Sequence, residues 1–144
     1  MQIEWSARDS SRGWTISAIV AAVAAAALRV AGVPPVDLHG PLHYWGIMDP
    51  LCGGTRAAFL LLSGDLAGAA RYNPIVFPLA AIVLGLLIRA GIGAIGRRWL
   101  AIRVPVGWRR TLLAVLAVMV VLLWIRQQAE ADLLTRAWAG APLR

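Results

Sequence analysis

Three long apolar segments, residues 14–31, 74–95 and 111–125, constrain the fold of this chain more than any other feature. A helix needs about 20 residues to cross the roughly 30 Å hydrocarbon core of a bilayer. The second segment meets this length. The third has 15 apolar residues and must either borrow neighbours such as Gln127 and Gln128 or thin the bilayer locally. We therefore predict an all-α integral membrane protein with three transmembrane helices, in which residues 1–144 form a single membrane domain.

The composition agrees with a lipid environment. Hydrophobic residues make up 60% of the chain and charged residues 15%, against about 45–50% and 25% in soluble domains. The formal charge is +7, and all 14 basic residues are arginines. These arginines punctuate the apolar segments, as in the flanks of a membrane protein, and do not form a soluble basic face. The pattern argues against a nucleic-acid partner and for contact with a lipid bilayer.

The first apolar segment has two interpretations. Arg8 and Arg12 precede it and it ends near Gly32, which is also the layout of a cleavable secretory signal. We expect a retained transmembrane helix. With three spans, the amino end and the loop 96–110 share one side and hold seven arginines, against five on the other side. The positive-inside bias then predicts a multi-pass protein of the bacterial cytoplasmic (inner) membrane with a cytoplasmic N-terminus.

Two arginines, Arg29 and Arg89, lie inside or at the margin of apolar segments, where a charge is costly. Each is close enough to an interface for its side chain to snorkel there without a special function. The alternative for Arg29 is an ion pair with Asp49 or Asp65.

The segment 49–74, between the first two spans, contains the unusual residues. Its run DPLCGGTR leads into a helical stretch, for which we predict an interfacial or partly re-entrant helix. Thr55 is the expected N-cap of this helix. The glycines before it and Arg56 offer backbone donors and a positive charge that could hold an anion, such as a lipid phosphate, at the helix N-terminus. The alternative is an ordinary turn that enters a capped helix.

Asp65 indicates either a break in this helix or a distant partner. It lies nine residues after Arg56, which is about 180° around a straight helix, so the two cannot pair unless the chain breaks at Gly64. Two outcomes remain open. Asp65 caps a second short helix after Gly64, or it reaches another element such as Arg29.

A metal or redox site is a further hypothesis. His39, His43, Asp49 and Cys52 fall within 14 residues and could supply four ligands to a metal ion. They lack the tight paired spacing of zinc motifs, and the alternative is that the histidines make ordinary polar contacts near the interface. Cys52 is the only cysteine, so an intrachain disulfide is excluded. The sequence identifies no cofactor.

The segment also carries three short motifs in a fixed order: Cys52-Gly53-Gly54-Thr55-Arg56, Gly64-Asp65 and Asn73-Pro74. This order, over about residues 49–77, resembles a bacterial family of small membrane proteins catalogued as domain of unknown function 2752. Members of that family typically carry a second cysteine three positions before the first, where this chain has Asp49. The departure undermines the disulfide or dithiol role that the family would imply, while Asp49 could still act as a ligand. The resemblance implies a membrane location and a shared core motif, with no established activity.

These observations favour a non-catalytic accessory or interaction subunit of a larger membrane assembly. Its partners would be other membrane protein subunits or a second copy, and small residues at Gly85, Gly91 and Gly93 would let a neighbouring helix pack closely. Two alternatives stay open. One is a metal-dependent or redox membrane enzyme that uses the loop 39–52, and the other is binding of anionic lipid headgroups at the outer face.

Overall fold

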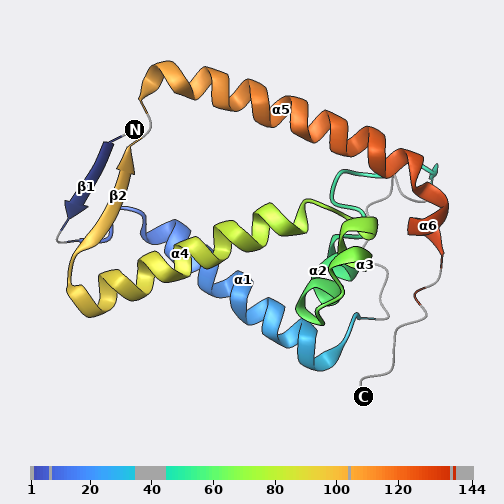
Figure 1. Cartoon of the computed structure of the whole chain (residues 1–144), viewed down its shortest axis with the longest axis horizontal. Helices are drawn as coiled ribbons and strands as arrows, with labels where there is room; N and C mark the ends of the chain where they lie inside the picture. Colours follow the sequence, from blue (N-terminus) through green and yellow to red (C-terminus); the bar gives the residue numbers. More distant parts are fainter. Residues whose placement is uncertain (1, 7, 35–44, 104, 137, 139–144) are drawn as a thin grey trace. The chain divides into compact units, whose positions relative to one another are not determined.

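The computed structural model describes residues 2–6, 8–34, 45–103, 105–136 and 138. Within these residues the chain is mostly helical, with one small sheet (Figure 1). The helices are α1 (Arg12–Ala31), α2 (Gly54–Leu62), α3 (Leu66–Tyr72), α4 (Val76–Gly96), α5 (Val106–Ala129) and α6 (Ala131–Thr135), and the strands are β1 (Gln2–Ser6) and β2 (Trp99–Arg103).

The three predicted spans are confirmed. By length and composition, α1, α4 and α5 can each cross a membrane, so this is a multi-pass membrane protein. The third span is longer than its apolar core, because α5 begins at Val106 and continues through the polar residues Gln127 and Gln128. Its 24 residues correspond to about 36 Å at 1.5 Å per residue, which is enough to cross the hydrocarbon core.

The helical stretch between the first two spans is two helices, α2 and α3. Gly64 follows the end of α2 in a left-handed conformation, with φ of 85°. Glycine commonly adopts this conformation just after a helix, where the following amides can donate to the last carbonyls of the helix. The amide of Asp65 then donates to Leu60 O at 2.9 Å. A helix between the first and second spans was predicted, and the break at Gly64 belongs to the first of the two outcomes that the sequence left open for Asp65.

The sheet was not predicted. Strand β1 pairs with β2 in an antiparallel ribbon, in a register that runs from Gln2↔Arg103 to Ser6↔Trp99 (Figure 1). Each strand has only five residues, which is too short for a clear alternation of apolar and polar positions. The ribbon adds a small sheet to a fold that is otherwise all-α.

The chain divides into two compact units, which are described separately. Unit 1 consists of Met1–Val23 and Leu79–Ala117, and unit 2 of Ala24–Pro78 and Val118–Arg144. Unit 1 contains the ribbon and the adjoining parts of the spans. Unit 2 contains α2, α3 and α6, and most of its buried apolar residues form two clusters: Met48, Cys52 and Leu134, and Ala57, Ala69 and Val76.

Candidate functional site

The motif begins with a tight turn before α2 in unit 2. The Asp49 side chain accepts a hydrogen bond from Leu51 N at 2.7 Å, and Gly54 N donates to Leu51 O at 2.8 Å. Gly53 has φ of 75°, and a Cβ added there would lie 2.6 Å from Leu134 Cδ2. Only glycine combines that backbone conformation with that close approach.

The prediction that Thr55 caps α2 is wrong. The N-cap is Gly53, and no side chain makes a capping hydrogen bond there. Because the turn ends at Gly53, α2 begins at Gly54 and Thr55 lies inside the first helical turn. A threonine side chain in that position is past the residue whose oxygen would reach the second and third amides of the helix.

Two fully buried amide side chains hold the turn to the rest of unit 2. The Asn73 Nδ2 group donates to Pro50 O and Cys52 O, both at 3.0 Å, and its Oδ1 accepts from Ile75 N at 3.1 Å. Gln127, from the end of α5, donates to Cys52 O and Tyr72 O at 2.6 and 3.1 Å. Both side chains have exposed fractions of 0%, so these bonds replace the water that the amides lose on folding.

Two arginines of unit 2 bind carbonyls at helix C-termini. Arg126 Nη2 donates to Ala70 O and Arg71 O near the end of α3, at 3.0 and 2.9 Å. Arg56 Nη1 donates to Leu134 O and Arg136 O at the end of α6, at 3.1 and 3.0 Å. The last carbonyls of a helix lack intrahelical donors and carry partial negative charge, so each guanidinium both satisfies and neutralises a helix end.

Aromatic rings enclose Arg56. Its guanidinium carbon lies 5.8 Å from the centre of the Tyr72 ring and 5.6 Å from that of Trp138. The Trp138 ring also meets Phe59 and Tyr72 edge-on, at centroid distances of 6.4 and 5.4 Å. These contacts place the predicted anion-binding arginine between rings and backbone carbonyls of its own unit. The lipid-phosphate hypothesis for Arg56 stays a prediction.

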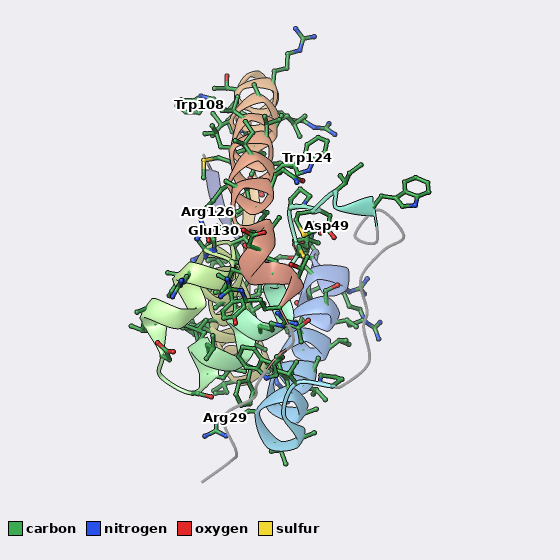
Figure 2. All side chains as sticks on the ribbon, turned by 90° about the vertical axis from the view of Figure 1, so that its right-hand side faces the viewer. Arg29, Asp49, Trp108, Trp124, Arg126 and Glu130 are labelled. Carbon is green, nitrogen blue, oxygen red and sulfur yellow. The ribbon has the colours of Figure 1, made fainter. Side chains whose placement is uncertain are left out.

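Asp65 caps the second short helix, as one of the two predicted outcomes has it. Asp65 is the N-cap of α3, and its Oδ1 accepts from Gly68 N at 2.8 Å. The other outcome, an ion pair with Arg29, is wrong, and so is the Arg29–Asp49 pair. Arg29 is exposed, and in Figure 2 it lies well away from Asp49. The cap satisfies Asp65 locally, so no distant cation is needed.

The proposed metal ligands are only partly described. His39 and His43 lie outside the described residues, so the four-ligand site stays a prediction. Cys52 is buried, with its Sγ 3.6 Å from Met48 Sδ, and Asp49 accepts from Leu51 N. Among the described residues, no group of three or more histidine, cysteine, aspartate or glutamate side chains is placed to hold a metal ion.

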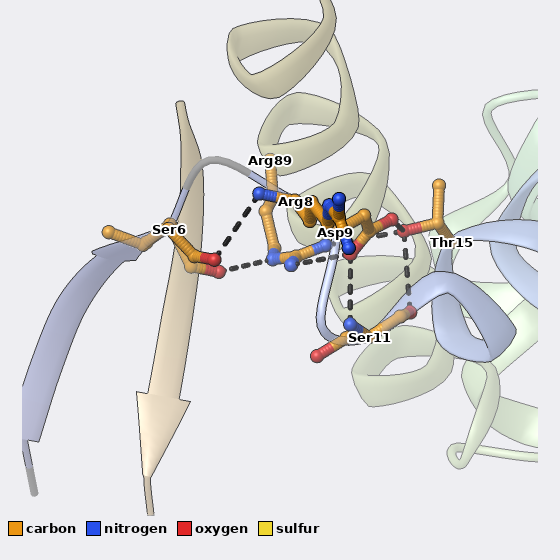
Figure 3. A network of polar contacts seen from close by, with 7 residues as sticks. Ser6, Arg8, Asp9, Ser11, Thr15 and Arg89 are labelled. Atoms are coloured by element: carbon orange, nitrogen blue, oxygen red, sulfur yellow. Dashed lines mark hydrogen bonds and ion pairs between the residues drawn. The ribbon is translucent and has the colours of Figure 1, made fainter. Parts of the chain in front are cut away.

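Unit 1 contains a second polar network, around Arg89 (Figure 3). Arg89 Nη2 forms an ion pair with Asp9 Oδ1 at 2.8 Å, Nη1 donates to Thr15 Oγ1 at 3.2 Å, and Nε donates to Leu100 O. The prediction that Arg89 snorkels to an interface is therefore wrong. Its side chain is only 9% exposed. Asp9, 80 positions earlier in the chain, accepts a hydrogen bond from its guanidinium and neutralises its charge.

The same network acts on Asp9. Burial opposes ionisation, but hydrogen bonds from Thr15 Oγ1, Arg89 and Ser11 N, together with the charge of Arg89, outweigh it. The pKa of Asp9 is therefore below its ordinary value of 3.8. The carboxylate is ionised at neutral pH, which keeps Arg89 neutralised at the end of the span.

Sequence reasoning found the motif but missed its partners. Arg126 and Trp138 were not singled out, Gln127 was treated only as an extension of a span, and Asp9 was not considered. One signal was available: the polar run Arg126-Gln127-Gln128 ends an otherwise apolar segment. Polar groups there must find partners when they are buried, so the run pointed to a docking site at that end of the span.

Comparison with known proteins gives one match. A profile of the family described as "protein of unknown function (DUF2752)" matches residues 42–87. The chain is thus similar to that family over the motif and the first half of α4, and the resemblance read from the sequence is confirmed. The match does not extend to Arg126 and Gln127. No curated protein and no solved structure matches the chain.

Proposed function

We propose that this chain is a non-catalytic accessory subunit that associates, within a membrane, with other membrane proteins or with a second copy of itself. The observation that carries the proposal is a contrast in how side chains are used. The polar side chains of the motif bind the backbone of their own unit, whereas apolar side chains of the spans are widely exposed.

The polar half of this contrast comes from unit 2. Asn73 and Gln127 are fully buried, and Arg56 and Arg126 bind carbonyls at helix ends. Within the described residues, no buried side-chain nitrogen or oxygen lacks a hydrogen-bond partner. A reaction centre requires groups that are free to approach a substrate. These side chains are already bonded within their own unit, which favours a structural role for the motif over a catalytic one.

The apolar half comes from α4, which has two different faces. At 100° per residue, Arg89 and Gly93 fall on one face, and this face meets β2, because the Trp99 ring contacts Arg89 and fills the space beside Gly93. Thus Gly93, predicted to receive a partner helix, is occupied within the chain. Away from Arg89 and Gly93, α4 carries exposed residues that form the set we call the α4 open face: Leu84, Ile88, Gly91, Ile92 and Ile95.

The α4 open face suits helix packing. Leu84, Ile88 and Ile92 are 59%, 55% and 50% exposed. A Cβ built on Gly91, or on Gly85 at the edge of this face, would meet no atom within 4 Å. Small residues between branched apolar ones let a second helix approach closely in lipid, where packing drives association.

Site-specific photo-crosslinking in native membranes tests the proposal. A photoreactive side chain at Leu84 or Ile88 should yield a discrete protein adduct of reproducible mass. Ile82 is the matched control, since it is similarly exposed, at 56%, but lies about 160° around the helix from Leu84. The protein mass of the particle extracted with its surrounding lipid should exceed the 15.4 kDa of one chain. Lipid adducts alone at all three positions, with a particle of single-chain mass, would refute the proposal.

A further inference from the structure

The positive charge of the chain is concentrated in unit 1. This unit contains eight arginines and two acidic residues, a formal charge of +6, whereas unit 2 contains six arginines and five acidic residues, a formal charge of +1. One of the two acids of unit 1, Asp9, is already paired with Arg89. Glu4 is the other acidic residue of the unit, against seven further arginines.

Six exposed arginines of unit 1 flank the ends of the three spans. Arg12 is the first residue of α1, Arg97 and Arg98 directly follow α4, and Arg109 lies in the first turns of α5. The pairing of Ser6 with Trp99 brings the segment after β1 close to the segment before β2. We call this set the arginine rim: Arg8, Arg12, Arg97, Arg98, Arg109 and Arg110.

The β1–β2 ribbon beside the rim is amphipathic. Trp99 faces α4, where its ring lies over Arg89 at 5.6 Å. Neighbouring residues of a strand point to opposite faces, so Trp5, which pairs with Leu100, belongs to the other face and is 58% exposed. Trp14 and Trp108 of the same unit are 68% and 70% exposed. Tryptophan rings concentrate at the depth of lipid headgroups.

We propose that the arginine rim, together with the exposed Trp5 face of the ribbon, binds the anionic phospholipid headgroups of the leaflet next to unit 1. The ends of three membrane spans fix the rim at headgroup depth, so the phosphates of the bilayer itself are the anions within reach. A guanidinium binds phosphate oxygens through two parallel hydrogen bonds. The rim shares no residue with the α4 open face, so different substitutions test the two proposals.

A substitution at Arg97 can test the proposal without weakening the fold. Among the described residues it is the one non-glycine with a positive φ, at 50°. It occupies the position just after a helix, where glycine is usual because it adopts the left-handed conformation without steric cost. Replacing Arg97 by glycine therefore removes a charge from the rim while it eases the backbone.

The test is native mass spectrometry of the full chain, titrated with phosphatidylglycerol or with zwitterionic phosphatidylcholine. A basic side chain near an anionic surface changes the affinity about five-fold. Arg97→Gly should therefore weaken phosphatidylglycerol binding about five-fold, with an unchanged or raised unfolding temperature, and Arg97→Gly with Arg98→Gln about 25-fold. Phosphatidylcholine binding should stay the same. Arg71→Gln, an exposed arginine of unit 2, is the control and should change phosphatidylglycerol binding less than about two-fold.

Three results would overturn the proposal. They are undiminished phosphatidylglycerol binding by the double variant, an equal loss in Arg71→Gln, and full displacement of the lipid by inorganic phosphate at the same concentration. The last result would identify a soluble anion as the ligand. If the double variant does not fold, Arg97→Gly alone decides the question.

Discussion

Gln127 and Asn73 donate to the same backbone oxygen, that of Cys52, at 2.6 and 3.0 Å. Gln127 comes from the end of the last span and Asn73 from the end of α3, just before α4. Each also donates to a second carbonyl, Tyr72 O and Pro50 O respectively. One carbonyl of the motif turn thus links two chain segments that are more than 50 residues apart, through side chains that have no access to water.

Replacing Gln127 by Met should destabilise the chain by about 1–3 kcal/mol, because Tyr72 O loses a buried donor. Gln128→Met is the matched control: Gln128 is the next residue and also bonds the backbone, at Gly46 O and Met48 N, but its side chain is exposed. Water can replace its bonds, so we expect less than about 1 kcal/mol. Cys52, the only cysteine and buried, makes labelling by a thiol-reactive fluorophore a direct measure of unfolding. Equal effects of the two substitutions would contradict the buried role of Gln127.

Gly53→Ala should cost about 2–4 kcal/mol, because the new methyl group combines a left-handed backbone with a contact 2.6 Å from Leu134 Cδ2. Gly54→Ala tests the neighbouring glycine, at which an added Cβ would meet nothing within 4 Å. It should be neutral or slightly stabilising, since alanine is the better helix former. Thermal unfolding followed by circular dichroism measures both. A neutral Gly53→Ala would show that the turn does not hold this conformation.

Asp9 should make stability fall at acidic pH. Its pKa is lower in the folded chain than the ordinary value of 3.8, so its ionised form stabilises the fold above that value, and this contribution is lost as the pH falls through the lower folded pKa. Between about pH 6 and pH 3, the unfolding temperature of the wild type should decline more steeply than that of Asp9→Asn. If the unfolding temperatures of the two proteins changed in parallel with pH, the pKa of Asp9 would be the same in the folded and unfolded chains. Tryptophan fluorescence follows unfolding over this range.

The arginine distribution predicts that the carboxyl terminus lies outside the cytoplasm. Alkaline phosphatase fused after the last residue should be active, and a green fluorescent protein fused there should be dark. Fusions placed in the loop 96–110 should behave in the opposite way. The reverse pattern at both sites would invert the predicted orientation, whereas the helices themselves would be unaffected.

The spans and the motif were predictable from sequence because both are local signals. Apolar length alone identifies α1, α4 and α5, and the motif residues follow one another in a fixed order over a short segment between α1 and α4. The helix end at Gly64 with a capping Asp65 follows from turn chemistry.

The contacts between distant segments were not predictable. Gln127 meets Cys52 across 75 positions, and Arg89 meets Asp9 across 80. Nothing in the sequence ranks Asp9 above the other acids as a partner for Arg89, because that choice depends on how the segments pack. The ribbon was not predicted for the same reason, because its two short strands are recognisable only when they are considered together.

The pairing of β1 with β2 constrains how the chain is made. Residues 2–6 leave the ribosome before their partners at 99–103, which emerge almost 100 residues later, after two spans have been synthesised. At about 5–20 residues per second, the first strand waits on the order of 10 s without its complement. During that interval its backbone donors and acceptors stay with water or the headgroup layer, so the ribbon can close only after α4 has been made.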